Sequence, residues 1–355
     1  MSFVTQKYKH PYDFYDLLVS TKGMFKDYSK ELINEVKKYY PERNIYLTNK
    51  GRESLNIILK NLNLNENDEI AIPSNVCEVV IETILYNKLK PLIIDITDNL
   101  TLDPKDLARK KTSKTKAVII VHHFGNIADL DEITKSNLIV IEDCAQTIDG
   151  KYKGKIVGNF ADYSFNSLDI TKPISAISGS ILVSKKPLTF KLKNSLGLKN
   201  LIELKLFIML NNKLIYNLIT KRFITKIKQK QTLNFKIENK AMSKISMAIA
   251  YSQYKKYPFR KNYARKIISN LKNIKIYSEE NELKTPSYTV LPVKLNKNKL
   301  KNILDLPQPS PPLIYLNKYK PYYSYCPNTE KIYRDLTLIQ THTDISGIKW
   351  ERYII

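Results

Sequence analysis

Cysteine and glycine are scarce in this sequence of 355 residues, and acidic residues are outnumbered by basic ones. The three cysteines, Cys77, Cys144 and Cys326, lie far apart without CxxC spacing, which argues against a disulfide framework and against a zinc site. No apolar run is long enough to span a bilayer, and the N-terminal residues lack the apolar core of a signal peptide. We therefore expect a soluble globular protein of the reducing cytoplasm.

Positive charge is the main compositional bias. Lysine and arginine number 58 against 34 aspartate and glutamate residues, which leaves a formal net charge of +24. This excess favours anionic partners, of which nucleotide sugars, an anionic membrane surface and nucleic acid are the candidates. Because Lys, Ile, Asn and Tyr are all abundant, part of the excess is compositional. No nucleic-acid-binding motif is present, so we do not expect nucleic acid as a partner.

Short apolar runs alternate with helical patterns in the first half of the chain. The expected strands are residues 44–48, 68–73, 91–95, 117–121 and 138–141, and the expected helices are 28–40, one that begins at Gly51, 76–85 and 130–134. Such alternation predicts an α/β fold with a parallel sheet that is covered on both faces. A chain of this length can bury a sizeable core.

A carboxylate and a lysine stand at the edges of two expected strands. The apolar run at 138–141 leads directly into Glu142 and Asp143, the pattern of a buried parallel strand that ends on a carboxylate. Lys172 precedes a proline and a second apolar run at 181–183. In open α/β sheets the ligand crevice lies outside the carboxyl ends of the strands. A lysine amine can form a Schiff base with a pyridoxal-type aldehyde, and a carboxylate can keep its pyridine nitrogen protonated.

The sequence around these residues resembles a known family. IEDCAQ, YKGKIVG, NFAD and the run from Ser164 through Lys172 to Gly179 are similar to the central block of the DegT/DnrJ/EryC/StrS sugar aminotransferases, and IPSNVC and VHHFGNIADLDEI are similar to segments before it. The resemblance implies fold type I: a mostly parallel sheet covered by helices on both faces, with a smaller C-terminal α+β domain. It also implies pyridoxal 5'-phosphate as the cofactor.

The resemblance assigns roles within the central block. Lys172 is the catalytic residue that binds the cofactor covalently, Asp143 pairs with the pyridine nitrogen, and Gln146 lies against the cofactor. In the family, the phosphate-binding serine stands five residues before the lysine and is usually followed by Phe. The spacing selects Ser167, whereas the serine that a Phe follows is Ser164. Both serines stay candidates, and the spacing favours Ser167.

Further cofactor-binding residues are implied outside the central block. The turn of Gly51, Arg52 and Glu53 stands where the family holds the cofactor phosphate, and a helix N-terminus suits an anion. Glu53 departs from the usual small residue, and an ordinary helix start is the alternative. Cys77 matches a position over the cofactor ring, or else is a buried small hydrophobe. Asn234 is similar to an asparagine that reaches the phosphate in the partner subunit.

Two histidines, His122 and His123, follow the strand expected at 117–121. Adjacent residues on a strand point to opposite faces, so the pair makes a poor chelate and we expect no metal site. We expect one of them to pack near the cofactor crevice and the other to face protein.

The chain divides into four parts. We expect an N-terminal arm at 1–27, a large cofactor-binding domain at 28–186, a helical region at 187–257 and a small C-terminal domain at 258–355. The helical region is rich in Leu, Ile and Lys, and a basic amphipathic segment can lie on an anionic membrane surface. One interpretation is therefore peripheral membrane contact through residues 199–230. The favoured alternative is a pair of core-packing helices with lysine-coated outer faces.

Together these features predict a pyridoxal-phosphate-dependent aminotransferase. The resemblance implies a nucleotide-linked keto sugar as substrate, glutamate as amino donor, a homodimer, and a place in surface polysaccharide or glycan precursor biosynthesis. A sugar dehydratase of the same fold is disfavoured because a histidine replaces the lysine in the known ones. Two different functions stay open: a non-transaminating protein that binds pyridoxal phosphate or a sugar nucleotide, and a basic protein of the membrane surface.

Overall fold

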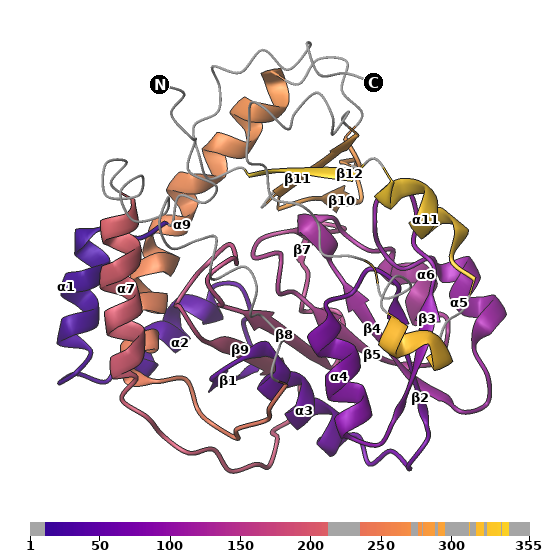
Figure 1. Ribbon diagram of the computed structural model, residues 1–355, viewed down its shortest axis with the longest axis horizontal. Helices are drawn as coiled ribbons and strands as arrows, with labels where there is room; N and C mark the ends of the chain where they lie inside the picture. The colour runs from indigo at the N-terminus through magenta and orange to yellow at the C-terminus, as the bar shows by residue number, and fades with distance from the viewer. Residues whose placement is uncertain are drawn as a thin grey trace.

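A seven-stranded mixed sheet forms the centre of the protein in the computed structural model (Figure 1). The structure describes residues 11–211, 235–270, 276–278, 280–287, 290–294, 312, 317–322, 325–334 and 336–340. Every strand of the sheet except β9 runs in the same direction. In spatial order the strands are β1 (Asn44–Thr48), β9 (Ser180–Ser184), β8 (Tyr163–Ser167), β5 (Ile139–Asp143), β4 (Thr115–Val121), β2 (Glu69–Pro73) and β3 (Lys90–Ile94).

Helices cover both faces of this sheet, as Figure 1 shows. One face is covered by α3 (Gly51–Asn61) and α4 (Glu78–Tyr86). The other is covered by α5 (Pro104–Lys110) and α6 (Leu130–Thr134) beside β2, β3 and β4, and by α1 (Phe14–Lys22), α2 (Ser29–Lys37), α7 (Leu198–Leu210) and α9 (Lys244–Asn270) beside β1 and β9. The expected fold class is confirmed.

The strands are apolar on both faces because both faces are covered. On β4, Ile119 packs in the cluster with α3 and α4, whereas Val118 and Ile120 pack in the cluster with α5 and α6. Successive side chains of a strand point to opposite faces, so a strand buried on both sides reads as a continuous apolar run. This is why the run at 117–121 indicates a strand from the sequence alone.

Two helices of the structure are not among those expected from the sequence. α1 lies inside the expected arm and α5 follows β3. α1 begins at a capping box, in which the Asp13 carboxylate accepts from the Asp16 backbone N–H and the Asp16 carboxylate accepts from that of Asp13. Lys256 of α9 forms ion pairs with both carboxylates, at 2.6 Å from Asp13 and 2.9 Å from Asp16. These contacts hold α1 against α9.

The C-terminal part is built from small elements. α9 is one continuous helix through Pro258, so the boundary expected at residue 257 falls inside it. β11 (Val290–Lys294) pairs with β12 (Leu336–Gln340), and β10 (Lys284–Thr285) joins β6 (Lys151–Tyr152) and β7 (Lys155–Ile156). The remaining elements are η1 (His123–Gly125), η3 (Asn317–Tyr322) and α11 (Pro327–Tyr333). None of the helices within the described ranges is long and apolar enough to cross a membrane.

The Asp95 carboxylate links the end of β3 to the C-terminal helix α11. It accepts hydrogen bonds from the backbone N–H groups of Asn328 and Thr329, both at 2.9 Å, and from the Thr329 hydroxyl at 2.6 Å. Asn328 and Thr329 lie in the first turn of α11, where N–H groups lack partners within the helix and where the helix dipole favours an anion. Asp95 thus caps a helix from a distant part of the chain.

We expect Asp95→Ala to lower the free energy of unfolding by about 3 kcal/mol, because it leaves the donors in the first turn of α11 without their acceptor. Urea unfolding would measure the loss, and amide hydrogen exchange would show faster exchange in residues 327–333. Asp162→Ala is the matched control, since Asp162 forms an exposed pair with Lys185 worth at most about 1 kcal/mol. Equal losses in the two variants would contradict the cap.

Candidate active site

The predicted site residues gather where parallel strands end. β5 ends on Asp143, β8 ends on Ser167, and β4 is followed by His122 and His123. β4, β5 and β8 are parallel neighbours, so their carboxyl ends meet at the same edge of the sheet. In open α/β sheets this edge is where ligands bind.

The Asp143 carboxylate is buried at this edge, with 5% of the residue exposed. It accepts a hydrogen bond from the Ala145 backbone N–H at 2.9 Å. Burial raises the pKa of Asp143, and the Ala145 N–H and the positive charge of Lys172 act in the opposite direction. The site therefore places a buried carboxylate in the field of the predicted catalytic lysine.

Lys172 lies in the turn that follows β8 and is half-buried. Its backbone N–H donates to the Asp169 carbonyl at 3.0 Å, which fixes the turn. Its charge acts on both Asp143 and His123. In the part of the chain that the structure describes, the ammonium forms no ion pair. The structure thus brings Lys172 and Asp143 together without pairing the amine with a carboxylate.

The two adjacent histidines point to different surroundings. His122 lies 3.3 Å from a Glu142 oxygen through Nε2, and its Nδ1 accepts from the Ala128 N–H at 3.4 Å, so it faces protein. The His123 ring packs on Phe124 with 4.0 Å between ring centroids, and its Nδ1 has no hydrogen-bond partner among the described residues. Burial and the charge of Lys172 lower the pKa of His123 to about 3. His123 is therefore the histidine beside the site.

A group of three buried side chains, His122, Glu142 and Cys144, has ligand atoms within 4.8 Å of one another. Its carboxylate is already engaged. One Glu142 oxygen accepts from the N–H groups of Phe160 and Ala161 at 2.9 and 2.8 Å, and the second oxygen accepts from that of Gly158 at 2.6 Å. These bonds and His122 lower the pKa of Glu142 against the effect of burial. Through these bonds the Glu142 carboxylate anchors residues 158–161 to β5.

The start of α3 lies against the end of β8. A Cβ atom added at Gly51 would lie 3.6 Å from the Cβ of Ser167 and 3.7 Å from the Phe165 ring. The N-cap residue of α3, Lys50, makes no side-chain capping bond. Ser164 lies inside β8, where its hydroxyl donates to the Gly158 carbonyl at 2.8 Å. Of the two candidate serines, Ser167 is the one beside the helix N-terminus.

The Glu53 side chain points away from this turn. Its carboxylate accepts from the backbone N–H groups of Glu238 and Asn239 at 2.7 and 3.0 Å. The carboxylate thus holds a loop that is distant in the sequence. Arg52 is placed over the Phe235 ring, with its guanidinium carbon 5.5 Å from the ring centroid.

The remaining predicted residues are Gln146, Cys77 and Asn234. The Gln146 side-chain oxygen accepts a hydrogen bond from the Phe124 N–H at 2.6 Å, which links the loop after β5 to η1. Cys77 is the N-cap residue of α4 and is exposed, so it is not a buried core residue. Asn234 lies outside the described residues. Sequence reasoning missed the ring of Phe165 beside Gly51, and the signal that could have found it is the Ser164-Phe165 pair itself.

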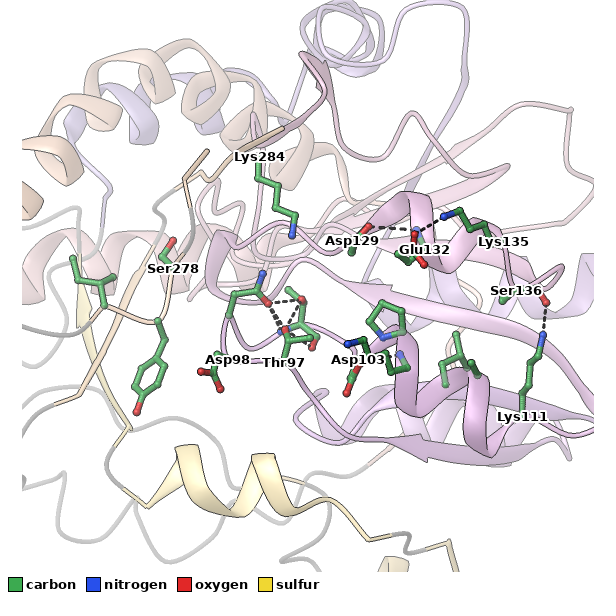
Figure 2. Close-up of a pocket in the computed structure, with 18 residues that line it drawn as sticks. Thr97, Asp98, Asp103, Lys111, Asp129, Glu132, Lys135, Ser136, Ser278 and Lys284 are labelled. Carbon is green, nitrogen blue, oxygen red and sulfur yellow. Dashed lines mark hydrogen bonds and ion pairs between the residues drawn. The ribbon is translucent and has the colours of Figure 1, made fainter. Parts of the chain in front are cut away.

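A pocket of about 930 Å³ opens elsewhere, between α5, α6 and the segment around β10. Figure 2 shows Lys284 extending from β10 toward the loop of Thr97, with Asp103 and Lys111 on one wall and Asp129 on another. None of the residues predicted for the cofactor site lines it. Its wall mixes both signs of charge, so it does not select an anion.

Comparison with known proteins gives a match over nearly the whole chain. The model of the DegT/DnrJ/EryC1/StrS aminotransferase family matches residues 14–352. GDP-perosamine synthase of Escherichia coli O157:H7 is 36% identical over 140 residues, which are 38% of each chain. dTDP-3-amino-3,6-dideoxy-alpha-D-galactopyranose transaminase of Aneurinibacillus thermoaerophilus is 36% identical over 117 residues, 32% of each chain. The aligned part therefore spans about a third of the length of these curated relatives.

Solved structures share the fold at low identity. PseC of Helicobacter pylori, an aminotransferase involved in the biosynthesis of pseudoaminic acid, has a TM-score of 0.74 at 16% identity, with 98% of this chain and 96% of that chain covered. GDP-4-keto-6-deoxymannose-3-dehydratase with a trapped PLP-glutamate geminal diamine has a TM-score of 0.73 at 16% identity, with 98% of each chain covered. The same fold thus serves both transamination and dehydration.

The buried His123 gives a testable pH dependence of stability. Its folded pKa of about 3 lies below the ordinary value of 6.5, so between these values the unfolded chain binds a proton that the folded chain does not. Stability should therefore fall as the pH falls from about 6.5 toward 3, by about 1.4 kcal/mol per pH unit from this group.

We expect His123→Phe to remove this contribution to the pH dependence of the unfolding free energy, because the Phe side chain binds no proton. Urea unfolding of both proteins between about pH 4 and 6 would measure it. If the difference in unfolding free energy between the two proteins is the same at each pH, His123 is not held neutral by burial.

Proposed function

The chain belongs to the DegT/DnrJ/EryC1/StrS aminotransferase family, and on this premise we propose that it is a pyridoxal-phosphate-dependent aminotransferase acting on a nucleotide-linked keto sugar. The observation that carries the proposal is the placement of Lys172 and Asp143 within each other's electrostatic field at the carboxyl edge of the sheet. The nucleotide-linked substrate is supported by the relatives, whose names specify GDP-linked and dTDP-linked sugars.

The residues at the crevice fit the cofactor. Asp143 offers a buried carboxylate that gains from a cationic partner, which a protonated pyridine nitrogen would be. The α3 N-terminus at Gly51 lies beside Ser167, and backbone N–H groups with a hydroxyl bind a phosphate well. Lys172 would attach the cofactor covalently and Gln146 would lie beside its ring. When bound, the cofactor supplies an electron sink for the electrons released at the amino donor's carbon.

The chain's own groups then move one proton. The Lys172 amine would take the proton from the amino donor's reacting carbon and would later deliver a proton to the sugar carbon that receives the amino group. The turn after β8 keeps the amine at this place. His123 stays neutral near pH 7, so it adds no second cation beside Lys172. Asp143 would hold the protonated pyridine nitrogen, which supplies the cation that its buried carboxylate lacks.

The finer features of the proposal rest on the family resemblance and the relatives. Glutamate as amino donor is supported by the dehydratase structure, which holds glutamate joined to its cofactor. We propose a homodimer in which Asn234 reaches the partner's cofactor, as the family motif implies. A cytoplasmic place agrees with cysteines that form no disulfide in the described part of the chain. The amino-sugar chemistry of the relatives supports a role in surface polysaccharide or glycan precursor biosynthesis.

Lys172→Ala should lose covalent cofactor attachment. The purified wild-type protein with pyridoxal phosphate should show a visible absorption band, and borohydride reduction followed by peptide mapping should place the label on Lys172. Adding glutamate should bleach the band in the wild type. Lys185→Ala, which changes an exposed lysine paired with Asp162, is the control and should keep both responses. A label spread over surface lysines would contradict the assignment of Lys172. An absorption band that amino donors leave unchanged would contradict transamination.

The two serines make a second test. Ser167→Ala should weaken cofactor binding about tenfold, because a hydrogen bond to a charged phosphate is worth about 1.5 kcal/mol. Ser164→Ala should leave the affinity unchanged and cost about 1 kcal/mol of stability through its lost bond to Gly158. Equilibrium dialysis would measure the affinities and urea unfolding the stabilities. The reverse pattern would assign the phosphate to Ser164.

A further inference from the structure

The large hydrophobic side chains that are exposed gather on two neighbouring helices. In the described part of the chain twelve such residues are exposed, and three of them, Tyr86, Leu283 and Tyr325, lie elsewhere. The remaining nine belong to α1, α7 and the residues next to them. We call this surface the α1–α7 face: Phe14, Tyr15, Leu18, Phe25, Leu196, Leu198, Ile202, Leu206 and Met209.

On α7 the exposed residues form one stripe along the helix. Leu198, Ile202 and Leu206 are spaced by four residues, so they lie one above another. Leu201 and Leu204 face the core on the opposite side. A helix that is apolar on both sides is normally buried on both sides. The outer face of α7 thus carries an apolar stripe, with the exposed Lys199 and Lys205 beside it.

α1 and α7 are held together, so the nine side chains belong to one rigid surface. Figure 1 shows the two helices side by side at the edge of the molecule, outside α9. The rings of Tyr12 and Phe207 pack with 6.1 Å between centroids, and the Asn211 side chain donates to the Tyr12 carbonyl at 3.1 Å. The core side of α1 is fixed by the Lys256 ion pairs described above.

Lysines lie beside this apolar surface. Lys22, Lys26, Lys199 and Lys205 are exposed on or next to the two helices, and two of them form ion pairs, Lys26 with Glu31 and Lys199 with Glu203. The excess of positive charge comes from the sequence that follows α7, since residues 211–234 contain five lysines, one arginine and no acidic residue. Apolar side chains with lysines around them match the boundary between the acyl chains and the headgroups of an anionic bilayer.

We propose that the α1–α7 face docks the protein on the surface of an anionic phospholipid bilayer. The aliphatic and aromatic side chains enter the headgroup boundary, and the lysines contact the lipid phosphates. A second copy of the chain fits the surface less well. In a two-fold contact the same patch lies on both subunits, so the positive charge of the sequence that follows α7 would be brought to the contact from both sides. The proposal is independent of the chemistry proposed for Lys172.

Co-sedimentation of the full chain with vesicles tests the proposal. We expect binding to vesicles of phosphatidylcholine mixed with phosphatidylglycerol, little binding to phosphatidylcholine alone, and a decrease as salt screens the lipid charge. Ile202→Glu combined with Leu206→Glu should lower the partition coefficient about tenfold or more. Leu283→Glu combined with Tyr325→Glu changes two exposed residues elsewhere by the same charge and should bind like the wild type.

A second variant separates lost binding from lost folding. Lys199→Gln combined with Lys205→Gln leaves the apolar residues in place and should still weaken binding to anionic vesicles. Circular dichroism should show all variants folded. The proposal would be overturned if the wild type binds neutral and anionic vesicles equally well. It would also be overturned if the α7 substitutions leave vesicle binding unchanged. A wild type that binds no vesicles while Ile202→Glu with Leu206→Glu lowers its oligomeric state in light scattering would overturn it as well, because the face would then be a subunit contact.

Discussion

The buried carboxylate of Glu142 is the interaction on which the candidate site depends. No part of Glu142 is exposed, and a buried charge is strongly destabilising unless hydrogen bonds satisfy it. Three backbone N–H groups of residues 158–161 and the imidazole of His122 satisfy it here. The bonds fasten the loop before β8 and the loop after β4 onto β5. The carboxyl ends of β4 and β5 and the start of β8 are thereby fixed relative to one another.

The two adjacent acidic residues of β5 therefore have different roles. Glu142 and Asp143 point to opposite faces because they are successive residues of a strand. Glu142 is surrounded by donors and its pKa is lowered, whereas Asp143 has one backbone donor and its pKa is raised by burial. Asp143 is thus the carboxylate that still gains from a cation. The difference between the two environments, and not the residue type, separates the structural acid from the proposed cofactor ligand.

Features set by local patterns could be predicted from the sequence, and features set by distant partners could not. The strands of the first half, the helix that begins at Gly51 and the place of Asp143 at the end of β5 follow from apolar runs and motif spacing. α1 was missed because its outer stripe is apolar and its core contacts come from α9. The direction of Glu53 depends on N–H groups 185 residues away. That Ser164 lies within β8 and Ser167 at its end depends on the pairing of β8 with β9, which the sequence does not show.

The cap that Asp95 forms on α11 has a consequence for the order of folding. The carboxylate and the N–H groups it binds are 233 and 234 residues apart, so this contact closes one of the longest loops in the chain. During synthesis on the ribosome the acceptor is made long before its donors. The contact between the end of β3 and α11 consequently forms only after residues 328 and 329 have been made. Contacts of such high sequence separation slow folding, and a chain truncated before residue 328 would leave a buried carboxylate without its partners.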